Sequence, residues 1–344
     1  MNPPVYVKDV EQLEELLSHP SADVIDDLKK TDGDFIVLGA GGKMGPSLSV
    51  MIRRALQAAG EDRKVYAVSR FSSQELVNYL TAKGIETIKG DLLDREFLQS
   101  LPKAQNVIYM AGMKFGSTQK ASMTWALNTL LPALVAETFH DSRIISFSTG
   151  NVYPFVPVSS GGCDETFAPA PIGEYAQSCL GRERMFEYFS HRYHTPGVII
   201  RLNYAVELRY GVLVDIALNV KQNAAIDVEM GYCNVIWQGD ANAMILRSLL
   251  LAESPPKIMN ITGPEIVSVR WIARQFGEKF NVTPQFVGQE ADTFLLNNAS
   301  QAHKLFGYPH ITIQHMIDWI ADWIERDMPL LNKPTHFQVR NGKF

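Results

Sequence analysis

The sequence predicts an α/β protein built on a doubly wound parallel sheet, with a small α/β domain towards the C-terminus. Short apolar runs recur along residues 35–203 and alternate with stretches of helical periodicity, as a parallel sheet requires. The first run, at 35–38, leads directly into a glycine-rich turn and a helical pattern. The composition agrees, because 344 residues of which 46% are hydrophobic suffice for one large or two closely joined domains.

The expected elements follow in chain order. An N-terminal extension contains helical patterns within 9–30, broken at Pro20, and is expected to pack on the outside of the fold or on a partner subunit. Up to residue 203 we expect strands at 35–38, 65–68, 86–94, 106–112, 143–148 and 197–203, and helices at 75–84, 122–139 and 174–192. Beyond 203 the pattern is less regular, with expected helices at 212–224, 239–252, 268–280 and 313–326 and strands at 235–237 and 258–263.

The turn after the first strand carries the first functional signal. The run FIVLGAGGKMG places Gly39, Gly42 and Gly45 between a buried strand and a helix. Such glycines let the backbone approach a pyrophosphate, whose charge is bound by free amides at the helix N-terminus. We predict that the chain has three parts. Residues 1–33 form a helical extension, and residues 34–203 and 232–262 form a dinucleotide-binding Rossmann-type domain. Residues 204–231 and 263–344 form a substrate-binding domain.

Charge and composition argue against several other classes. The net charge of −5 gives no basic footprint for nucleic acid, and no apolar run approaches the ~18–20 residues that span a membrane. The acidic N-terminus lacks the features of a secretory signal. Cys163, Cys179 and Cys233 lack metal-ligand spacing, and their odd number suggests reduced thiols. We expect a cytoplasmic protein without a metal site.

Two hydroxyl groups are candidates for proton transfer. Thr149 ends the strand at 143–148, at the sheet edge where ligands bind in such folds. Tyr175 follows 26 residues later on a helix. Beside a dinucleotide, this pair suits proton transfer to a carbonyl being reduced or from an alcohol being oxidised. Taken alone, Tyr175 also fits an ordinary, partly buried tyrosine.

The ordered set of glycine turn, GDLLD, MAG, STGNVY and Tyr175 resembles the extended short-chain dehydrogenase/reductase superfamily, and within it the NAD(P)-dependent epimerase/dehydratase family. The resemblance covers about residues 34–330. It implies hydride transfer to or from a hydroxylated, sugar-like substrate, with Thr149, Tyr175 and Lys114 in the active site. The expected cofactor contacts are Gly39, Gly42, Lys43, Met44, Gly45, Ser69, Arg70, Asp91, Leu92, Ala111, Gly112, Lys114, Asn128, Tyr175, Leu202 and Asn203.

The main departure from this family is Cys179. Members carry a lysine four residues after the tyrosine, which holds the cofactor ribose and lowers the tyrosine pKa, whereas Cys179 stands there in this chain. A neutral thiol cannot lower the pKa of a tyrosine from its usual value near ~10. Either another cation, with Lys114 the first candidate, replaces the lysine, or Tyr175 only donates a hydrogen bond, or the protein is a catalytically silent dinucleotide-binding protein. Cys179 itself is a small buried side chain or a catalytic thiolate.

Further residues bear on which cofactor and substrate the protein binds and on whether it forms a dimer. The strand at 65–68 ends in Ser69 and Arg70, where an NAD-specific member places a carboxylate, so the sequence favours NADP(H) and leaves NAD(H) open. Glu207 stands where nucleotide-sugar members usually have glycine, and the sequence around Asp240 lacks their arginine, which weakens the case for a nucleotide-sugar substrate. Segments 122–139 and 174–192 match the helices through which family members dimerise, so we expect a homodimer.

Overall fold

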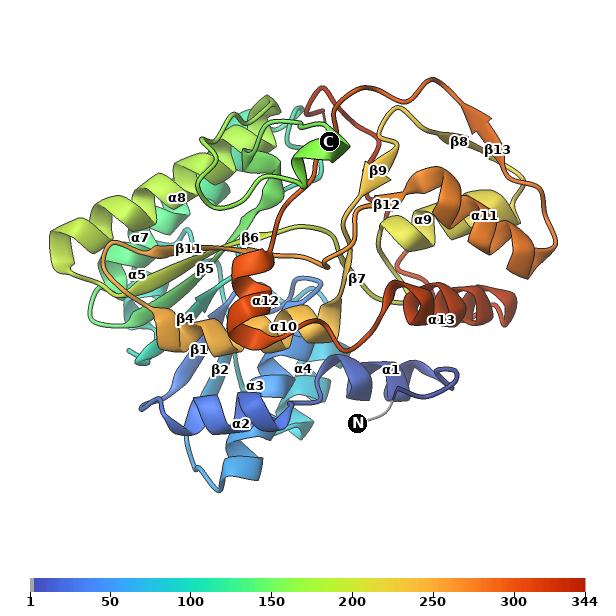
Figure 1. Cartoon of the computed structure of the whole chain (residues 1–344). Coiled ribbons are helices and arrows are strands. Elements are labelled where there is room, and N and C mark those ends of the chain that lie inside the picture. Colours follow the sequence, from blue (N-terminus) through green and yellow to red (C-terminus); the bar gives the residue numbers. More distant parts are fainter. Residues whose placement is uncertain (1–2, 344) are drawn as a thin grey trace.

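The computed structural model describes residues 3–343 and contains a seven-stranded parallel sheet (Figure 1). The strands are β1(Phe35–Leu38), β2(Val65–Ser69), β3(Glu86–Lys89), β4(Asn106–Tyr109), β5(Arg143–Thr149), β6(Gly197–Leu202) and β11(Lys257–Ile261). Their order is β3-β2-β1-β4-β5-β6-β11, and each neighbouring pair is parallel. The predicted fold class is confirmed. The strand order reverses between β1 and β4, which is where ligands bind in open sheets of this kind.

Helices cover both faces of the sheet because both faces of its strands are apolar. Phe35 and Val37 of β1 pack in one cluster, while Ile36 and Leu38 pack in another on the opposite face. The first face is covered by α2(Ala22–Lys29), α3(Gly45–Ala59), α10(Gln238–Arg247) and α12(Ser300–Phe306). The second is covered by α5(Arg95–Ser100), α7(Leu131–Thr138) and α8(Gly173–Tyr193), and α4(Gln74–Ala82) lies beside β3.

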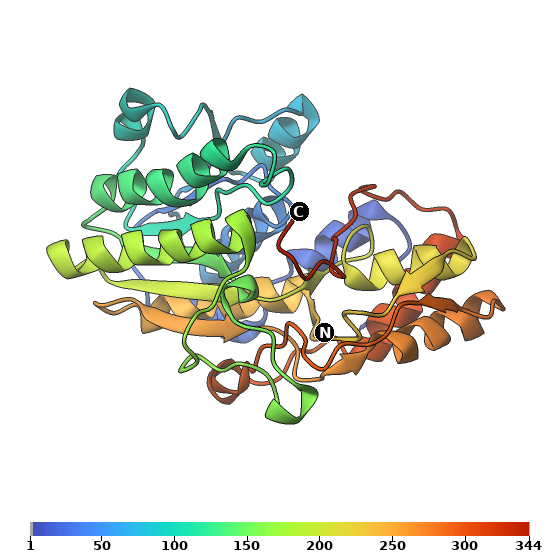
Figure 2. The same ribbon diagram turned by 90° about the horizontal axis from the view of Figure 1, so that it is seen from above.

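A smaller lobe stands beside the carboxyl ends of the strands. Its core is formed by α9(Val212–Lys221), α11(Val269–Phe280) and α13(Ile313–Glu325). Short strands complete it as three pairs: β7(Ala205–Val206) with β10(Ile236–Trp237), β8(Ala225–Asp227) with β13(Gln285–Val287), and β9(Tyr232–Cys233) with β12(Val267–Ser268). Viewed from above, the end of the chain lies between the two lobes (Figure 2). The domain boundaries given above stay a prediction.

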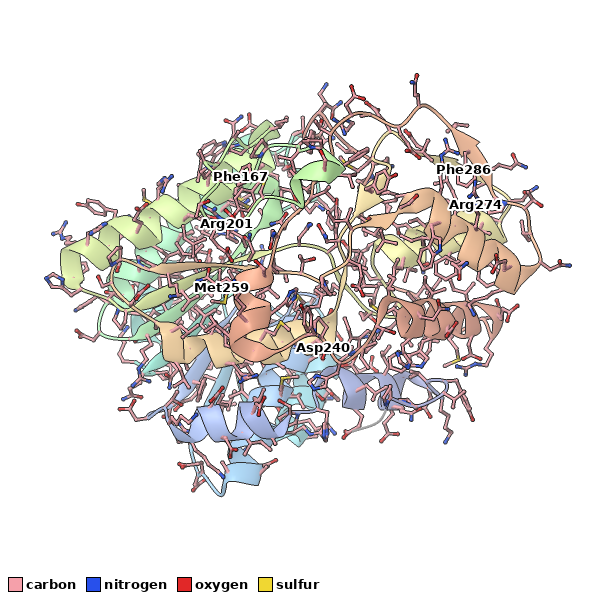
Figure 3. All side chains as sticks on the ribbon, in the orientation of Figure 1. Phe167, Arg201, Asp240, Met259, Arg274 and Phe286 are labelled. Carbon is pink, nitrogen blue, oxygen red and sulfur yellow. The ribbon has the colours of Figure 1, made fainter. Side chains whose placement is uncertain are left out.

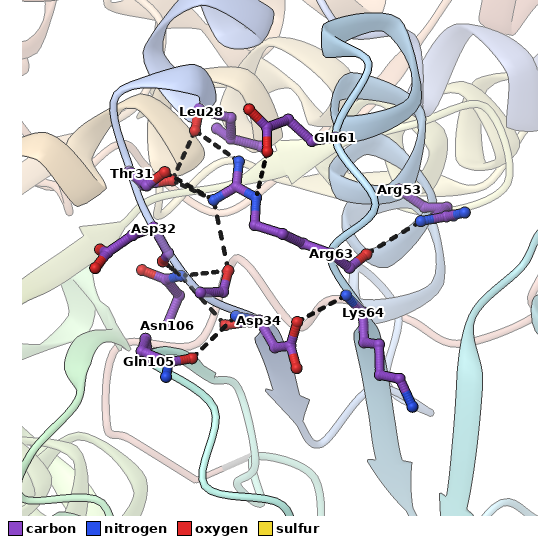
Figure 4. Close-up of polar contacts among 11 residues, drawn as sticks. Leu28, Thr31, Asp32, Asp34, Arg53, Glu61, Arg63, Lys64, Gln105 and Asn106 are labelled. Carbon is purple, nitrogen blue, oxygen red and sulfur yellow. Dashed lines mark hydrogen bonds and ion pairs between the residues drawn. The ribbon is translucent and has the colours of Figure 1, made fainter.

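The N-terminal extension packs on its own chain. Asp9 and Ser21 cap α1(Val10–Leu17) and α2. Leu13 and Leu17 of α1 are fully buried in the core of the smaller lobe, whereas α2 belongs to the sheet lobe. Arg63 fixes the end of α2 by donating to the carbonyl oxygen of Leu28 at 2.8 Å (Figure 4). The extension therefore joins the two lobes.

One expected helix is interrupted. Instead of one α-helix at 122–139, the chain forms α6(Ala121–Trp125), a π-helical turn at Ala126–Leu130, and then α7. Pro132 has no backbone N–H and cannot continue the α-helical hydrogen bonds, which explains the wider turn before it. Among residues 3–343, no helix has the length and apolar character needed to cross a membrane.

Candidate active site

Two cavities lie at the reversal point of the sheet. Both are lined by Met110 and Gly112, which directly follow β4. The first, of about 390 Å³, is bounded by the glycine turn and the end of β2. The second, of about 280 Å³, lies between the lobes and is bounded by the ends of β5 and β6. A long ligand can therefore lie across the sheet edge with one end in each cavity.

The glycine turn has the shape that a dinucleotide needs. Gly39 has φ +95°, and a Cβ added there would lie 2.6 Å from the backbone nitrogen of Ala111. A Cβ at Gly45 would lie 2.4 Å from the carbonyl oxygen of Ala40. Side chains are thus excluded where α3 begins, so that backbone amides there can approach an anion, although Pro46 in its first turn supplies none. The residues present fit a bound pyrophosphate.

Most of the predicted cofactor residues gather at these two cavities. The first cavity is lined by Gly39, Gly42, Ser69, Arg70, Asp91, Leu92, Ala111 and Gly112. The second is lined by Lys43, Met44, Gly112, Lys114, Thr149, Tyr175, Leu202 and Asn203. Asn128 instead lies fully buried behind them, where it accepts hydrogen bonds from the amide of Met113 at 2.8 Å and from Arg182 at 2.9 Å. Its position indicates that it orients these neighbours.

Thr149 and Tyr175 face each other in the second cavity. Thr149 ends β5 and is 7% exposed, and Tyr175 lies in the first turn of α8. Burial and the neighbouring Cys179 raise the pKa of Tyr175, whereas Arg182 and a hydrogen bond between the two hydroxyl groups oppose that rise. Because the raised pKa keeps the phenol of Tyr175 protonated near neutral pH, the pair can offer two hydroxyl groups to one substrate oxygen.

Cys179 lies one helical turn beyond Tyr175 and is fully buried. Burial raises the pKa of its thiol. The thiol is therefore protonated near neutral pH, which argues against a catalytic thiolate and favours a small buried side chain.

Arg182 is the cationic residue that sequence reasoning missed. It is 6% exposed and borders the same cavity as Tyr175. Its guanidinium donates to the carbonyl oxygen of Phe147 at 2.6 Å and to Asn128 at 2.9 Å, while its Nε has no hydrogen-bond partner among residues 3–343. The available signal was its spacing, since residues 175, 179 and 182 share one face of α8.

A buried ion pair holds α8 against the sheet. Glu183, the next residue on this helix, pairs with Arg201 of β6 at 2.7 Å and accepts from the hydroxyl of Ser148 at 2.5 Å. Arg201 is labelled beside α8 in Figure 3. Because Ser148 directly precedes Thr149, this pair fixes Thr149 relative to α8.

Two lysines reach the second cavity from opposite sides. Lys43 leaves the glycine turn, donates to the carbonyl oxygen of Ala205 at 2.6 Å, and lies 4.3 Å from the ring centre of Tyr210. Lys114 donates to the carbonyl oxygen of Thr335 at 3.3 Å, and its ammonium lies 5.9 Å from the ring centre of Tyr175. Burial lowers the pKa of each lysine to about 8.

Comparison with known proteins identifies the fold. No protein-family model and no curated protein matches the sequence. Among solved structures, an epimerase from Methanothermobacter thermautotrophicus matches with a TM-score of 0.72 at 18% identity, over 90% of this chain and 97% of that one. The Bacillus cereus UDP-glucuronic acid 4-epimerase, solved with UDP-glucuronic acid and NAD, matches with a TM-score of 0.69 at 16% identity, over 85% and 99%. The Thermus thermophilus UDP-glucose 4-epimerase, solved with NAD, matches with a TM-score of 0.69 at 18% identity, over 85% and 99%.

The chain has the fold of the nucleotide-sugar epimerases. The resemblance inferred from the sequence motifs is thereby confirmed at the level of structure. At 16–18% identity the likeness concerns the fold, so the chemistry has to be argued from this chain's own residues.

Proposed function

We propose that the protein is an NAD(P)-dependent oxidoreductase of the epimerase/dehydratase type, acting on a hydroxylated, sugar-like substrate. One observation carries the proposal: the hydrogen-bonded pair of Thr149 and Tyr175 stands in a cavity that adjoins the glycine cradle. The three solved neighbours described above are epimerases, and two of them were solved with NAD.

When bound, the nicotinamide takes up or returns a hydride. On the protein side, burial keeps the phenol of Tyr175 protonated near neutral pH, so it donates its proton to a substrate carbonyl oxygen while the carbonyl carbon receives the hydride, and a hydroxyl group forms. The hydroxyl of Thr149 donates to the side chain of Asn151 at 3.1 Å in this structure, and it would turn this hydrogen bond to the same substrate oxygen. In the reverse direction the phenolate left on Tyr175 takes the proton back.

Arg182 takes the electrostatic place of the missing lysine in this proposal. It is a cation that opposes the rise in the Tyr175 pKa. Each pKa unit by which a cation stabilises the phenolate is worth about 1.4 kcal/mol, or tenfold in the phenolate population. Lys114, the first candidate from the sequence, has its ammonium 5.9 Å from the ring centre of Tyr175 and stays a second candidate for this role.

The cofactor preference rests on the end of β2. Ser69 and Arg70 border the first cavity, whose only carboxylate among the described residues is that of Asp91. Arginine can form two hydrogen bonds with a 2′-phosphate, which supports NADP(H). The two similar epimerases from Thermus thermophilus and Bacillus cereus were instead solved with NAD.

The test is a cofactor-binding titration together with turnover on a panel of sugars. We expect a change in nicotinamide absorbance or a rearranged sugar product from wild type. Tyr175→Phe should abolish this reaction while retaining cofactor affinity. Tyr308→Phe, at a tyrosine that is 70% exposed, is the matched control. Unchanged turnover in Tyr175→Phe contradicts the mechanism. Tight cofactor binding without any reaction in wild type favours the catalytically silent alternative.

A further inference from the structure

The end of the chain crosses the cleft between the two lobes. Residues 328–343, which we term the C-terminal strap, follow α13 and run between the lobes (Figure 2). Thr335 of the strap lines the candidate active-site cavity of about 280 Å³. The next residue, His336, lines a separate cavity of about 510 Å³ between α9, β8 and the strap. Tyr210 lines both cavities, so the strap forms part of the wall between them.

The middle of the strap is bound to the smaller lobe. The amide of Leu331 donates to the carbonyl oxygen of Arg209 at 3.1 Å. The amide and the hydroxyl of Thr335 both donate to the carboxylate of Asp215 on α9, at 2.7 and 2.6 Å. Phe337 is 5% exposed and packs in the core of this lobe. Release of the strap from this lobe would expose a buried ring and remove two donors from a carboxylate.

The end of the strap has a second anchor on the same lobe. The guanidinium of Arg340 donates to the carbonyl oxygen of Thr293 at 2.6 Å and to its hydroxyl at 3.1 Å. It also lies 3.6 Å from the carboxylate of Glu229 and 4.5 Å from the ring centre of Phe155, which packs against the core of this lobe. The strap is therefore fixed to the smaller lobe along most of its length.

The side chains that join the strap to the sheet lobe make looser contacts. The ammonium of Lys114 donates to the carbonyl oxygen of Thr335 at 3.3 Å. The ring centres of Phe115 and His336 are 6.1 Å apart, and Phe115 is still 41% exposed. Breaking these contacts exposes little additional apolar surface.

The strap also touches the sheet lobe where two glycines cross at the start of α8. Gly342 has φ +70° and Gly173 has φ +82°. A Cβ added to Gly342 would lie 2.3 Å from the carbonyl oxygen of Ile172. Among residues 3–343, no hydrogen bond joins Gly342 to Ile172 or Gly173. The two backbones touch here because neither glycine has a side chain, and Tyr175 follows only two residues later.

This difference indicates where the strap opens. Segments open at the lowest cost in free energy where few buried contacts hold them. On the smaller lobe the strap is held by a buried aromatic ring and by charge-assisted hydrogen bonds, whereas on the sheet lobe it is held by one flexible lysine, a loose ring contact and a backbone crossing. The strap should therefore stay with the smaller lobe when it opens.

We propose that the C-terminal strap is a movable wall of the active site, which stays with the smaller lobe and separates from Lys114 and the start of α8 when a ligand enters or leaves. Separation joins the two cavities into one wider cleft beside the turn that carries Tyr175, and return of the strap closes them off from each other. Such segments gate the entry and release of ligands in many enzymes. The inference concerns access to the site and goes beyond the proposed reaction.

The test measures distances between two spin labels in the full-length protein. The native cysteines are buried, so labels can be directed to introduced, exposed cysteines. The pair Lys333→Cys and Gln177→Cys joins the strap to α8. The matched control pair, Lys333→Cys and Glu278→Cys, joins the strap to α11 within the smaller lobe. Movement of the strap with the smaller lobe should change the first distance and leave the second unchanged.

Gly342→Ala should open the wall, because its methyl group cannot fit against the carbonyl oxygen of Ile172. In the strap-to-α8 pair we expect the ratio of long to short distances to rise on the order of tenfold. Saturating NADP⁺ or NAD⁺ should lower it again, since a ligand favours the state whose walls it contacts. The matched control is Gly161→Ala, where φ is +74° and nothing lies within 4 Å of an added Cβ; it should change neither distance.

Two further measurements support the assignment. Phe115→Ala should raise the same ratio, and it takes the place of Gly342→Ala if that variant does not melt close to the wild-type temperature. Displacement of bound NADPH or NADH, followed by stopped-flow fluorescence, should be on the order of tenfold faster in the opened variant and unchanged in Gly161→Ala.

Three results overturn the inference. Unchanged distances in folded Gly342→Ala and Phe115→Ala mean that the wall is fixed. A change in the control pair means that the strap leaves the smaller lobe. An unchanged displacement rate in an opened variant means that the strap does not gate the ligand. Failure of the proposed function is distinguishable, because the distances in the ligand-free protein require neither cofactor binding nor turnover.

Discussion

Moving the buried positive charge of α8 by one helical turn tests the role of Arg182. The perturbation is a pair of substitutions, Cys179→Lys and Arg182→Met, made singly and together. Cys179 is fully buried and Arg182 is 6% exposed, three residues further along the helix. The double variant restores the lysine of the epimerase/dehydratase family and removes the arginine.

The magnitudes follow from the geometry. Side chains three residues apart on a helix have Cβ atoms about 5–6 Å apart. Two charges ~6 Å apart at an effective dielectric constant of ~20 repel by about 3 kcal/mol, so Cys179→Lys alone should be strongly destabilising. Arg182→Met alone removes the charged donor to the carbonyl oxygen of Phe147 and one of the two donors to Asn128, which keeps its hydrogen bond from Met113, at about 1–3 kcal/mol. In the double variant the repulsion is absent. Its loss in the free energy of unfolding should therefore be smaller, by about 3 kcal/mol, than the sum of the losses in the two single variants.

The assays are denaturant unfolding and the pH profile of turnover. The pH profile separates the proposed electrostatic role from a purely structural one, because a cation beside Tyr175 shifts the pKa of the acid/base group. Arg182→Met should shift the alkaline limb of the pH profile to higher pH and reduce the rate on the order of ten- to a hundredfold. The double variant should recover much of this loss in rate. Gln177→Lys, on the exposed face of the same helix, is the control and should show no coupling to Arg182→Met.

Two results would refute the reasoning about Arg182. A coupling energy below about 0.5 kcal/mol, the usual level for independent sites, means that residues 179 and 182 do not share one charge site. An unchanged pH profile in a folded Arg182→Met protein means that the guanidinium is structural only.

Three further predictions concern the cofactor, the N-terminal extension and assembly. Arg70→Ala should weaken NADP(H) on the order of tenfold and leave NAD(H) unchanged in a fluorescence titration, and equal losses contradict the role of this guanidinium. Leu17→Ala, at a fully buried position of α1, should cost about 2–5 kcal/mol in denaturant unfolding, whereas a loss below ~1 kcal/mol means that α1 is dispensable. Met123 and Leu130 are 47% and 48% exposed on the helix expected to form a dimer, so light scattering should give a dimer at micromolar concentration that Leu130→Lys dissociates; a wild-type monomer refutes this.

The sheet could be predicted because the sequence of each strand by itself indicates whether the strand is buried on both faces. Residues 35–38, 107–109 and 144–149 are continuous apolar or small-residue runs, and burial on both faces is what a covered parallel sheet imposes. The two-residue strands of the smaller lobe carry no such pattern, because pairs such as Val267–Ser268 are defined by their partners rather than by their own sequence. The same limit applied to α1, whose buried leucines fitted either a partner subunit or this chain.

The residues of the candidate site could likewise be predicted only where the local sequence determines their position. The glycine turn, Thr149 and Tyr175 lie within motifs whose geometry is local, so their meeting at one sheet edge could be predicted. Thr335 could not, since it belongs to a segment without helical or strand periodicity and reaches the cavity only through hydrogen bonds with residues 120 and more positions away. Arg182 lies between these cases, as its helix was predicted but the rotation of that helix against β5 was not.

Cys179 and Arg182 can be explained together from the charges on the buried face of α8. The only carboxylate on the buried face of α8 is Glu183, which already pairs with Arg201 and accepts from Ser148. A lysine at 179 beside Arg182 would therefore add a second buried cation with no anion left to balance it. A small neutral thiol avoids this charge and leaves the guanidinium to act on Tyr175 alone. The absence of the family's lysine is thus compatible with an active site, because the electrostatic requirement is for one cation on this face of the helix and not for a lysine at one position.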